Sequence, residues 1–448
     1  YSETDTEVLV KAIDAKKGSS TLENIFKTLP TLQGSCACVM LSEKEEDVLY
    51  AFVKDSPLVI GVGEGENFVS SDLHAFIKYT RKVIYLEDNE VARITPNEIK
   101  IFKDPNHEMS KEVENISEEL NEAEKGIYEH FTLKEIFEQS KTLSQAFSTR
   151  INEEKQEVCF EEQSNLDIEL LKKTQRIVIL ACGTSWHAAY YASYLMEERL
   201  EIPVEVHMSS EFRYRKLLLQ ENTLVIAISQ SGETADTLAA LRTLKDKGAF
   251  VLGICNVMSS SIARMADAVL FLKAGPEIGV CSTKAFTSQV VVLFLLSLVM
   301  EKRRDAKVDS SLMIKALKGL PKQVQSILGQ SEKIHSLAKK YAKYEHFFYL
   351  GRHYMFPCSL EGALKLKEIT YINANAYPAG ELKHGSIALI SEGCPTLAFC
   401  CNRHTYTKMI NNIKEIKARG GKVLAVTQEG DIYMESLVDD VIFIPETI

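Results

Sequence analysis

A short apolar run at residues 224–228 (LVIAI) passes directly into the polar segment SQSGETADT at residues 229–237. The run predicts a buried strand, because it is rich in branched residues and too short for a helix. Helix-favouring residues begin at Leu238, so the polar segment lies between a strand end and a helix start. The first turn of a helix has unpaired N–H groups and a positive dipole end, and Gly232 lets an anion approach the backbone closely. The segment therefore predicts either a phosphate cradle that needs no lysine or an ordinary helix cap, since Ser and Thr favour caps.

The composition is that of a globular protein and narrows the classes of partner. The 448 residues are enough for about three domains, at roughly 150 residues each. The net charge of −10 argues against nucleic-acid binding, which normally requires a basic face. The ten cysteines show no paired zinc-site spacing, and we expect no metal. The longest apolar stretch, residues 290–300, is too short to span a bilayer and predicts a core helix. With no visible signal peptide, we expect a cytoplasmic protein without membrane contact.

The pattern of apolar, charged and turn-forming residues changes twice along the chain. Residues 1–103 contain short strand-like runs separated by turn signals, which predict an α+β domain of antiparallel strands. Residues 104–165 are charged and are predicted to form a helical or extended connector. Strand–helix alternation then appears in two stretches, which we assign to domains at residues 166–305 and 335–448.

The two stretches have the same internal spacing. In the first, a strand ends at Gly183 and a later strand follows Gly248; in the second, the matching glycines are Gly351 and Gly420. The offsets agree closely, since 351 − 183 = 168 and 420 − 248 = 172. Two similar doubly wound α/β domains with parallel sheets explain this pattern, and such sheets bind ligands outside the carboxyl ends of their strands.

Three loops of the first α/β domain are predicted to lie at strand ends. They are CGTS at 182–185, the SQSGETADT segment, and GVCSTK at 279–284. All three supply glycine and small hydroxyls, the groups that orient a polyhydroxylated, phosphorylated ligand. The sequence therefore predicts a sugar-phosphate site, with Ser229, Ser231, Thr234 and Thr237 as neutral donors around the phosphate.

The second α/β domain supplies titratable groups. Glu361, Lys365 and Glu368 are spaced by four and three residues, so they share one face of a predicted helix. Taken alone, this pattern is that of a solvated salt-bridge stripe. His384 follows in a glycine-bounded loop, and histidine is well suited to proton transfer near neutral pH. A carboxylate, a lysine and a histidine together are what an aldose–ketose rearrangement needs.

These motifs resemble those of the glutamine–fructose-6-phosphate aminotransferase (isomerising) family, whose isomerase half consists of two sugar-isomerase domains. The resemblance covers essentially all 448 residues. It is most specific in the segments ACGTS, SSEFRYRK, SQSGETADTL, EIGVCSTKAFTSQ, LEGALKLKEITYI and AYPAGELKHG. The segments SETDTEV and SPLVIGVGEGENFVSSD resemble the later part of the family's glutaminase domain, which is an α+β fold of the N-terminal-nucleophile type.

The resemblance implies a glutamine-dependent conversion of fructose 6-phosphate to glucosamine 6-phosphate, in the pathway to UDP-N-acetylglucosamine. It implies a homodimer and no organic cofactor. Glu368 would shuttle a proton between C1 and C2 of the sugar, Lys365 would help to stabilise charge, and His384 would promote ring opening across the dimer interface. The implied ligand-binding residues are Ser229, Gln230, Ser231 and Thr234 around the phosphate, Thr184, Ser185, Val280 and Ser282 along the sugar, and Asp5 at the glutamine amino group.

Two departures from the family pattern lead us to expect a chain truncated at both ends. The chain begins at Tyr1 without the family's amino-terminal cysteine, a nucleophile activated by its own α-amine. It stops at Ile448, before the tail that carries the family's Schiff-base lysine. We therefore expect no glutamine hydrolysis and weak or absent isomerase activity. The alternatives are a non-catalytic sugar-phosphate-binding regulator and an inactive scaffold. A regulator would be expected to carry a DNA-binding helix-turn-helix and a basic face, and the sequence shows neither.

Overall fold

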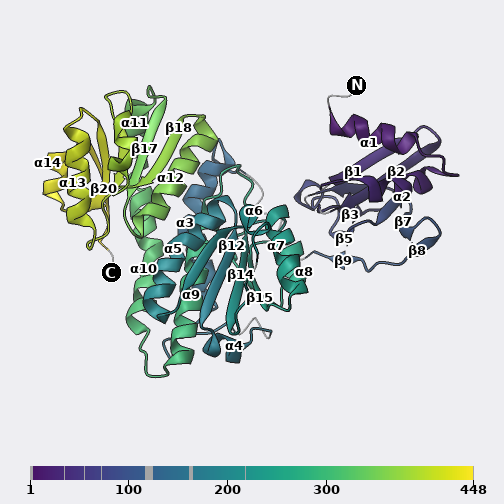
Figure 1. Ribbon diagram of the computed structural model, residues 1–448, viewed down its shortest axis with the longest axis horizontal. Helices are drawn as coiled ribbons and strands as arrows, with labels where there is room; N and C mark the ends of the chain where they lie inside the picture. The colour runs from purple at the N-terminus through teal and green to yellow at the C-terminus, as the bar shows by residue number, and fades with distance from the viewer. Residues whose placement is uncertain are drawn as a thin grey trace. The chain divides into compact units, whose positions relative to one another are not determined.

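The computed structural model in Figure 1 describes residues 4–446 except 35, 55, 72, 117–124, 161–164 and 217. The chain divides into two units, residues 1–123 and residues 124–448, which are described separately. The first unit contains two antiparallel sheets, and the second contains two parallel sheets with helices.

The sheets of the first unit have the strand orders β1-β2-β6-β7-β8 and β4-β3-β5-β9. Strand β2 shows why they stack in layers, because its successive side chains point to opposite faces. Tyr50 and Phe52 pack with the helices α1 and α2, whereas Ala51 and Val53 pack with residues of the other sheet. The elements are α1 (Asp5–Asp14), α2 (Thr21–Thr28), β1 (Cys36–Ser42), β2 (Glu45–Lys54), β3 (Val59–Val62), β4 (Asn67–Ser70), β5 (Lys82–Tyr85), β6 (Val91–Ile94), β7 (Ile99–Asp104), β8 (His107–Met109) and β9 (Glu114–Asn115).

The structure confirms the predicted antiparallel strands of the first unit, but it differs from the predicted connector at residues 104–165. Strands β8 and β9 fall inside that range, and each pairs at the edge of one sheet of the first unit. Both are short, charged edge strands, so the apolar alternation that marks a half-buried strand is missing from their sequences. The helix α3 (Phe131–Ser148) lies in the second unit and packs against α9.

The first α/β domain is built on the parallel sheet β13-β12-β14-β15-β16. Helices cover both faces, as Figure 1 shows, so the central strand β14 is buried along its whole length. This explains the apolar run at residues 224–228. The elements are β10 (Ile151–Asn152), β11 (Glu157–Val158), α4 (Ile168–Lys173), β12 (Arg176–Ala181), α5 (Gly183–Leu200), β13 (Val204–Met208), α6 (Ser209–Phe212), β14 (Thr223–Ser229), α7 (Ala235–Asp246), β15 (Val251–Cys255), α8 (Ser261–Met265), β16 (Ala268–Phe271) and α9 (Lys284–Arg304).

The second α/β domain repeats this topology, with the parallel order β18-β17-β19-β20-β21. The predicted duplication of a doubly wound domain is therefore confirmed, with the matching strands in matching places. The elements are α10 (Ser311–Leu328), α11 (Ser331–Tyr341), β17 (His346–Gly351), α12 (Met355–Thr370), β18 (Asn373–Pro378), the 3₁₀ turns η4 (Leu382–His384) and η5 (Ser386–Leu389), β19 (Thr396–Phe399), α13 (Tyr406–Lys417), β20 (Val423–Gln428), α14 (Ile432–Leu437) and β21 (Asp440–Ile444).

The helix α9 is the central core helix of the first α/β domain. Among the described residues it alone is long and apolar enough, by length and composition, to cross a membrane. Its apolar side chains are accounted for by the core, since Val292, Leu295 and Leu296 are fully buried against α5 and the sheet. The predicted core helix at residues 290–300 is confirmed.

Candidate active site

Two of the three predicted loops of the first α/β domain lie at the same edge of its sheet, whereas the third, 279–284, leads into α9 and does not directly follow a strand. Strands β12 and β14 are parallel neighbours, with Leu180 opposite Ala227. The segments that follow them, 182–185 and 229–234, therefore emerge side by side at the carboxyl ends of the strands. This is the edge at which open α/β sheets bind ligands.

The hydroxyls of the 229–234 loop hold the loop in shape rather than capping the helix. Ser229 Oγ lies 2.8 Å from Thr234 Oγ1 and accepts the Gly232 N–H at 3.0 Å. Ser231 Oγ accepts the Glu233 N–H at 3.2 Å. No side chain among the described residues caps the start of α7, although Thr234 occupies the capping position. The first N–H groups of α7 are left available to an anion, as a phosphate cradle requires.

Gly232 is the residue on which the shape of this loop depends. Its φ of +70° lies in the left-handed region, which side chains with a Cβ rarely adopt. A Cβ at this position would also lie 2.1 Å from Ser260 Oγ and 2.4 Å from its Cβ. The close approach of the loop to Ser260 therefore requires glycine.

Several predicted ligand-binding residues make internal contacts or lie elsewhere. Thr237 is fully buried and donates to Ser209 Oγ at 3.0 Å, so the expectation that it faces a phosphate is wrong.

The remaining predicted ligand-binding residues of the first α/β domain have different surroundings. Ser185 is buried and accepts from Gln289 Nε2 at 2.9 Å, and Ser282 donates to Glu277 Oε2 at 2.7 Å. Val280 is 83% exposed, so in this structure it lines no enclosed site. Gln230 is half-buried, and its backbone carbonyl accepts the Asn256 N–H at 3.0 Å.

The helix α12 of the second domain brings its titratable face to the first domain. As predicted, Glu361, Lys365 and Glu368 lie on one face, where Lys365 Nζ is 3.3 Å from Glu361 Oε1 and 2.8 Å from Glu368 Oε2. The face is not a solvated stripe, because Glu361 is 6% exposed. Thr184, at the start of α5, joins it to the first domain by donating to Glu361 Oε1 at 3.0 Å and accepting from Lys365 Nζ at 3.1 Å.

These contacts fix the charges of the group. Partial burial would raise the pKa of Glu368, but hydrogen bonds from Cys281 and Lys365 hold it below the usual value. Burial would lower the pKa of Lys365, but the neighbouring carboxylates of Glu361 and Glu368 raise it above the usual value. A carboxylate and an ammonium therefore face each other at neutral pH, as a base and an electrostatic partner would.

Sequence reasoning missed two residues of this group. His187 Nδ1 lies 2.7 Å from Glu361 Oε2, and the histidine is 9% exposed. The spacing of three residues between Thr184 and His187 was the available signal, because it places both on one face of α5. Cys281, between the predicted Val280 and Ser282, donates to Glu368 Oε2 at 3.0 Å.

His384 stands apart from this group. It is exposed at the end of the turn η4 after β18, and in the described part of the chain no hydrogen bond or ion pair joins it to Glu368 or Lys365. Its role in ring opening stays a prediction. Among the described residues, no cluster of three or more His, Cys, Asp or Glu side chains is placed to hold a metal ion.

Comparison with known proteins places this geometry in a family. The SIS domain family matches residues 170–299 and 340–446, inside the two ranges assigned above to α/β domains. A glutamine–fructose-6-phosphate aminotransferase (isomerising) of Chlorobaculum tepidum is 45% identical over 99% of this chain, which spans 73% of that relative's length. The enzyme of the same name from Caldanaerobacter subterraneus is 42% identical over all of this chain and 74% of its own length. The chain belongs to the glutamine–fructose-6-phosphate aminotransferase family.

A solved structure of this aminotransferase family supports the assignment at the level of the fold. The C-terminal domain of glucosamine–fructose-6-phosphate aminotransferase from Francisella tularensis superposes with a TM-score of 0.69 at 37% identity. It covers 73% of this chain and 92% of its own chain.

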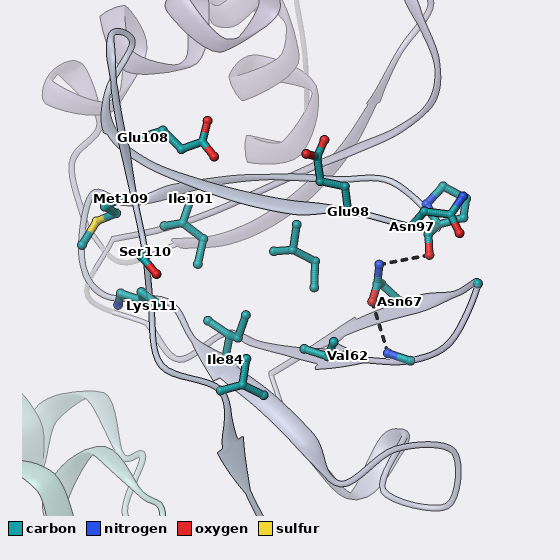
Figure 2. A pocket seen from close by; sticks show the side chains of 15 residues that line it. Val62, Asn67, Ile84, Asn97, Glu98, Ile101, Glu108, Met109, Ser110 and Lys111 are labelled. Carbon is teal, nitrogen blue, oxygen red and sulfur yellow. Dashed lines mark hydrogen bonds between the residues drawn. The ribbon is translucent and has the colours of Figure 1, made fainter.

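The first unit of this aminotransferase-family chain contains the remaining predicted residue, Asp5. Asp5 is exposed at the first position of α1, where its carboxylate accepts the Thr6 N–H at 2.8 Å. A separate hollow of about 660 Å³ lies between the two sheets of this unit, with Val62 and Ile84 on one side and Ile101 on the other, and Asn67 closes its rim by hydrogen bonds (Figure 2). Asp5 does not line this hollow, and its contact with glutamine stays a prediction.

Proposed function

We propose that this chain carries the sugar-phosphate half of a glutamine-dependent aminotransferase that converts fructose 6-phosphate to glucosamine 6-phosphate. Family membership and near-complete coverage by relatives of that name support this proposal. The observation that carries it at the level of residues is the contact of Thr184 with Lys365 and Glu361, which closes one site from two domains.

In the proposed site, the first backbone N–H groups of α7, at the end of the loop that Gly232 shapes, hold the phosphate dianion. Ser231 and Thr234 lie in that loop, and Thr184 lies one strand away, toward the acid–base group. Backbone N–H groups and a helix dipole suit this task because they bind a dianion without adding a charge that would compete with Lys365.

Glu368 is the proposed base. With C1 of the open-chain sugar beside its carboxylate, Glu368 takes a proton from C1 while the C1–H electrons form a double bond to C2. The charge that develops on the C2 oxygen is stabilised by the Lys365 ammonium, a preorganised cation in a partly buried site. The proton then returns from Glu368 to C2 while the C1 hydroxyl proton passes to the C2 oxygen, so the ketose becomes the aldose without a net change in protons. When ammonia from glutamine has first replaced the C2 oxygen as an imine, with loss of water, the same proton shift yields the 2-amino aldose.

Two further roles complete the proposal. His384 is exposed in a single chain, which suits a residue that completes the site of a second copy in a homodimer. Asp5 is proposed to bind the amino group of glutamine in the first unit. We propose a cytoplasmic location and no nucleic-acid or membrane partner.

The test follows hydrogen exchange at C1 of fructose 6-phosphate in heavy water, together with binding of the sugar phosphate by calorimetry. We expect the wild type to bind the sugar phosphate and to exchange its C1 hydrogen weakly, and Glu368→Gln to bind but to exchange roughly 10²–10⁴-fold more slowly than the wild type, the contribution of a positioned general base. Glu332→Gln, at an exposed position of α11, is the matched control and should behave as wild type. Binding without exchange would favour a sugar-phosphate regulator, and the absence of both would favour an inactive scaffold.

A further inference from the structure

The thiol of Cys281 lies in the acid–base group at a fixed position. Cys281 is fully buried at the end of the loop before α9. Two buried or half-buried carboxylates hold this loop. Glu135 Oε1 accepts the N–H groups of Ile278 and Gly279 at 2.6 and 3.0 Å. Glu277 accepts the N–H of Thr283 at 2.8 Å. The backbone on both sides of Cys281 is therefore held, and the thiol has little freedom to turn away.

The contacts of Glu368 are all on one oxygen. The Cys281 thiol donates to Glu368 Oε2 at 3.0 Å, and Lys365 Nζ donates to the same Oε2 at 2.8 Å. The thiol also lies 3.8 Å from the Lys365 carbonyl. Oε1 of Glu368 has no hydrogen-bond partner in the described part of the chain. The two carboxylate oxygens thus have different surroundings, one saturated and one available.

We propose that Cys281 is a positioning residue, which fixes the Glu368 carboxylate through Oε2 so that Oε1 is the oxygen that carries the sugar proton. This inference rests on the proposed function, because it assigns a partner to the proposed base. A carboxylate on a flexible side chain has two equivalent oxygens and several rotamers, and a second donor from another domain selects one arrangement. A misplacement of about 1 Å in such a group can cost roughly 10²-fold in rate.

The chemistry of the thiol suits a donor and not a nucleophile. Burial, together with the nearby Glu368 carboxylate, raises the pKa of Cys281 to about 12. The charged and titratable groups that face the pair are Lys365 and Glu361 from α12 and His187 from α5. The thiol is therefore protonated across the neutral range and can donate, whereas attack on a substrate would require the thiolate.

The first test is spectroscopic and needs no turnover. The S–H stretching band of Cys281 is isolated as the infrared difference between wild type and Cys281→Ala, and that of the buried Cys394 as the difference between wild type and Cys394→Ala. Donation to a carboxylate lowers the S–H frequency. We expect the Cys281 band at lower wavenumber than the Cys394 band, and we expect it to rise in Glu368→Ala. A Cys281 S–H frequency that is the same in wild type and in Glu368→Ala would overturn the inference.

The second test measures the pH profile of C1 exchange in Cys281→Ala and Cys281→Ser. Loss of a donor to the charged form raises the pKa of Glu368, so the acid limb of Cys281→Ala should move to higher pH by roughly half a unit to one unit. Its kcat should fall about tenfold with little change in KM, because the thiol acts on proton transfer and not on binding. Cys281→Ser keeps a hydrogen-bond donor, so its acid limb and its kcat should both lie close to those of wild type. Equal profiles for alanine and wild type would contradict the positioning role.

The two proposals fail in different ways. A wild type that binds the sugar phosphate without exchange contradicts the proposed function whatever the infrared band shows, and it then reduces Cys281 to a structural donor. Exchange that depends on Glu368, with an infrared band and pH profile indifferent to Cys281, keeps the proposed function and removes Cys281 from it.

Discussion

The two α/β domains have the same strand order but contribute different chemical groups. In the first, the segment after β14 supplies backbone amides, glycine and hydroxyls, with Ser229 Oγ 2.8 Å from Thr234 Oγ1. In the second, the helix after β17 supplies Glu361, Lys365 and Glu368 on one face. The first domain therefore contributes mainly backbone and hydroxyl donors to the proposed site, and the second domain contributes charged side chains.

In the proposed function, this difference separates phosphate binding from proton transfer. The hydroxyls and backbone amides of the cradle do not change charge near neutral pH. Glu233, in the same loop, is a half-buried carboxylate that accepts the Ser261 N–H at 2.7 Å, and burial raises its pKa. The acid–base group can then be tuned without altering the charge at the phosphate, and its pKa values are set by contacts within α12 and with the first domain. The single hydroxyl of Thr184, which touches both Glu361 and Lys365, couples the two halves.

The strongest test of this coupling removes the buried carboxylate that joins the domains. Glu361→Leu leaves Thr184 and His187 without the acceptor they share and removes one of the two carboxylates beside Lys365, so we expect a loss of about 3 kcal/mol in the free energy of unfolding. The measurement is urea unfolding followed by fluorescence of Trp186, the single tryptophan, which lies in the first domain on α5. Glu332→Leu on exposed α11 should change the free energy by less than about 0.5 kcal/mol. Equal values for the two variants would show that the domains are not coupled through Glu361.

A second variant tests the backbone half of the comparison. Gly232→Ala should destabilise the fold by about 2 kcal/mol, because the added Cβ meets Ser260 in addition to straining the backbone. It should also abolish measurable binding of fructose 6-phosphate. The control is Gly183→Ala, where φ is +53° but no atom lies within 4 Å of the added Cβ, so only the strain of about 1 kcal/mol applies. Full sugar-phosphate affinity in Gly232→Ala would contradict the cradle.

A third variant tests the side-chain half. Lys365→Met removes a cation that stabilises the ionised form of Glu368, so the pKa of Glu368 should rise. The acid limb of C1 exchange should therefore move to higher pH, while phosphate binding stays within about twofold of wild type. Carbon-13 shifts of the Glu368 carboxylate report the same titration directly. A lowered pKa in this variant would show that Lys365 does not set the charge of the base.

The smallest effect is expected at the residue that joins the halves. Thr184→Val removes one hydroxyl that both donates and accepts, and should cost about 1 kcal/mol in unfolding free energy. Thr184→Ser keeps the hydroxyl and should recover most of that loss. If serine and valine were equally unstable in urea, the methyl group and not the hydroxyl would be the contributing part.

The sequence predicted local structure well and the joining of distant segments poorly. The strand, turn and helix of residues 224–237 were predictable because the spacing of apolar residues and the position of glycine determine local backbone structure. The shared face of Glu361, Lys365 and Glu368 was predictable for the same reason, since it follows from their spacing along one helix. The contact of Thr184 with Lys365 spans 181 positions, and no local pattern encodes it. The prediction for Thr237 is wrong because a hydroxyl at the start of a helix can point toward the loop or toward the core. In the structure it points toward the core and donates to Ser209 Oγ. Strands β8 and β9 were missed because edge strands need no apolar alternation.

The most direct test of the account is a crystal structure with fructose 6-phosphate bound. The account predicts the phosphate within hydrogen-bonding distance of the first backbone N–H groups of α7, with C1 of the sugar facing Glu368 Oε1. A phosphate seated elsewhere, or a sugar whose C1 points away from α12, would contradict the division of binding and chemistry between the two domains.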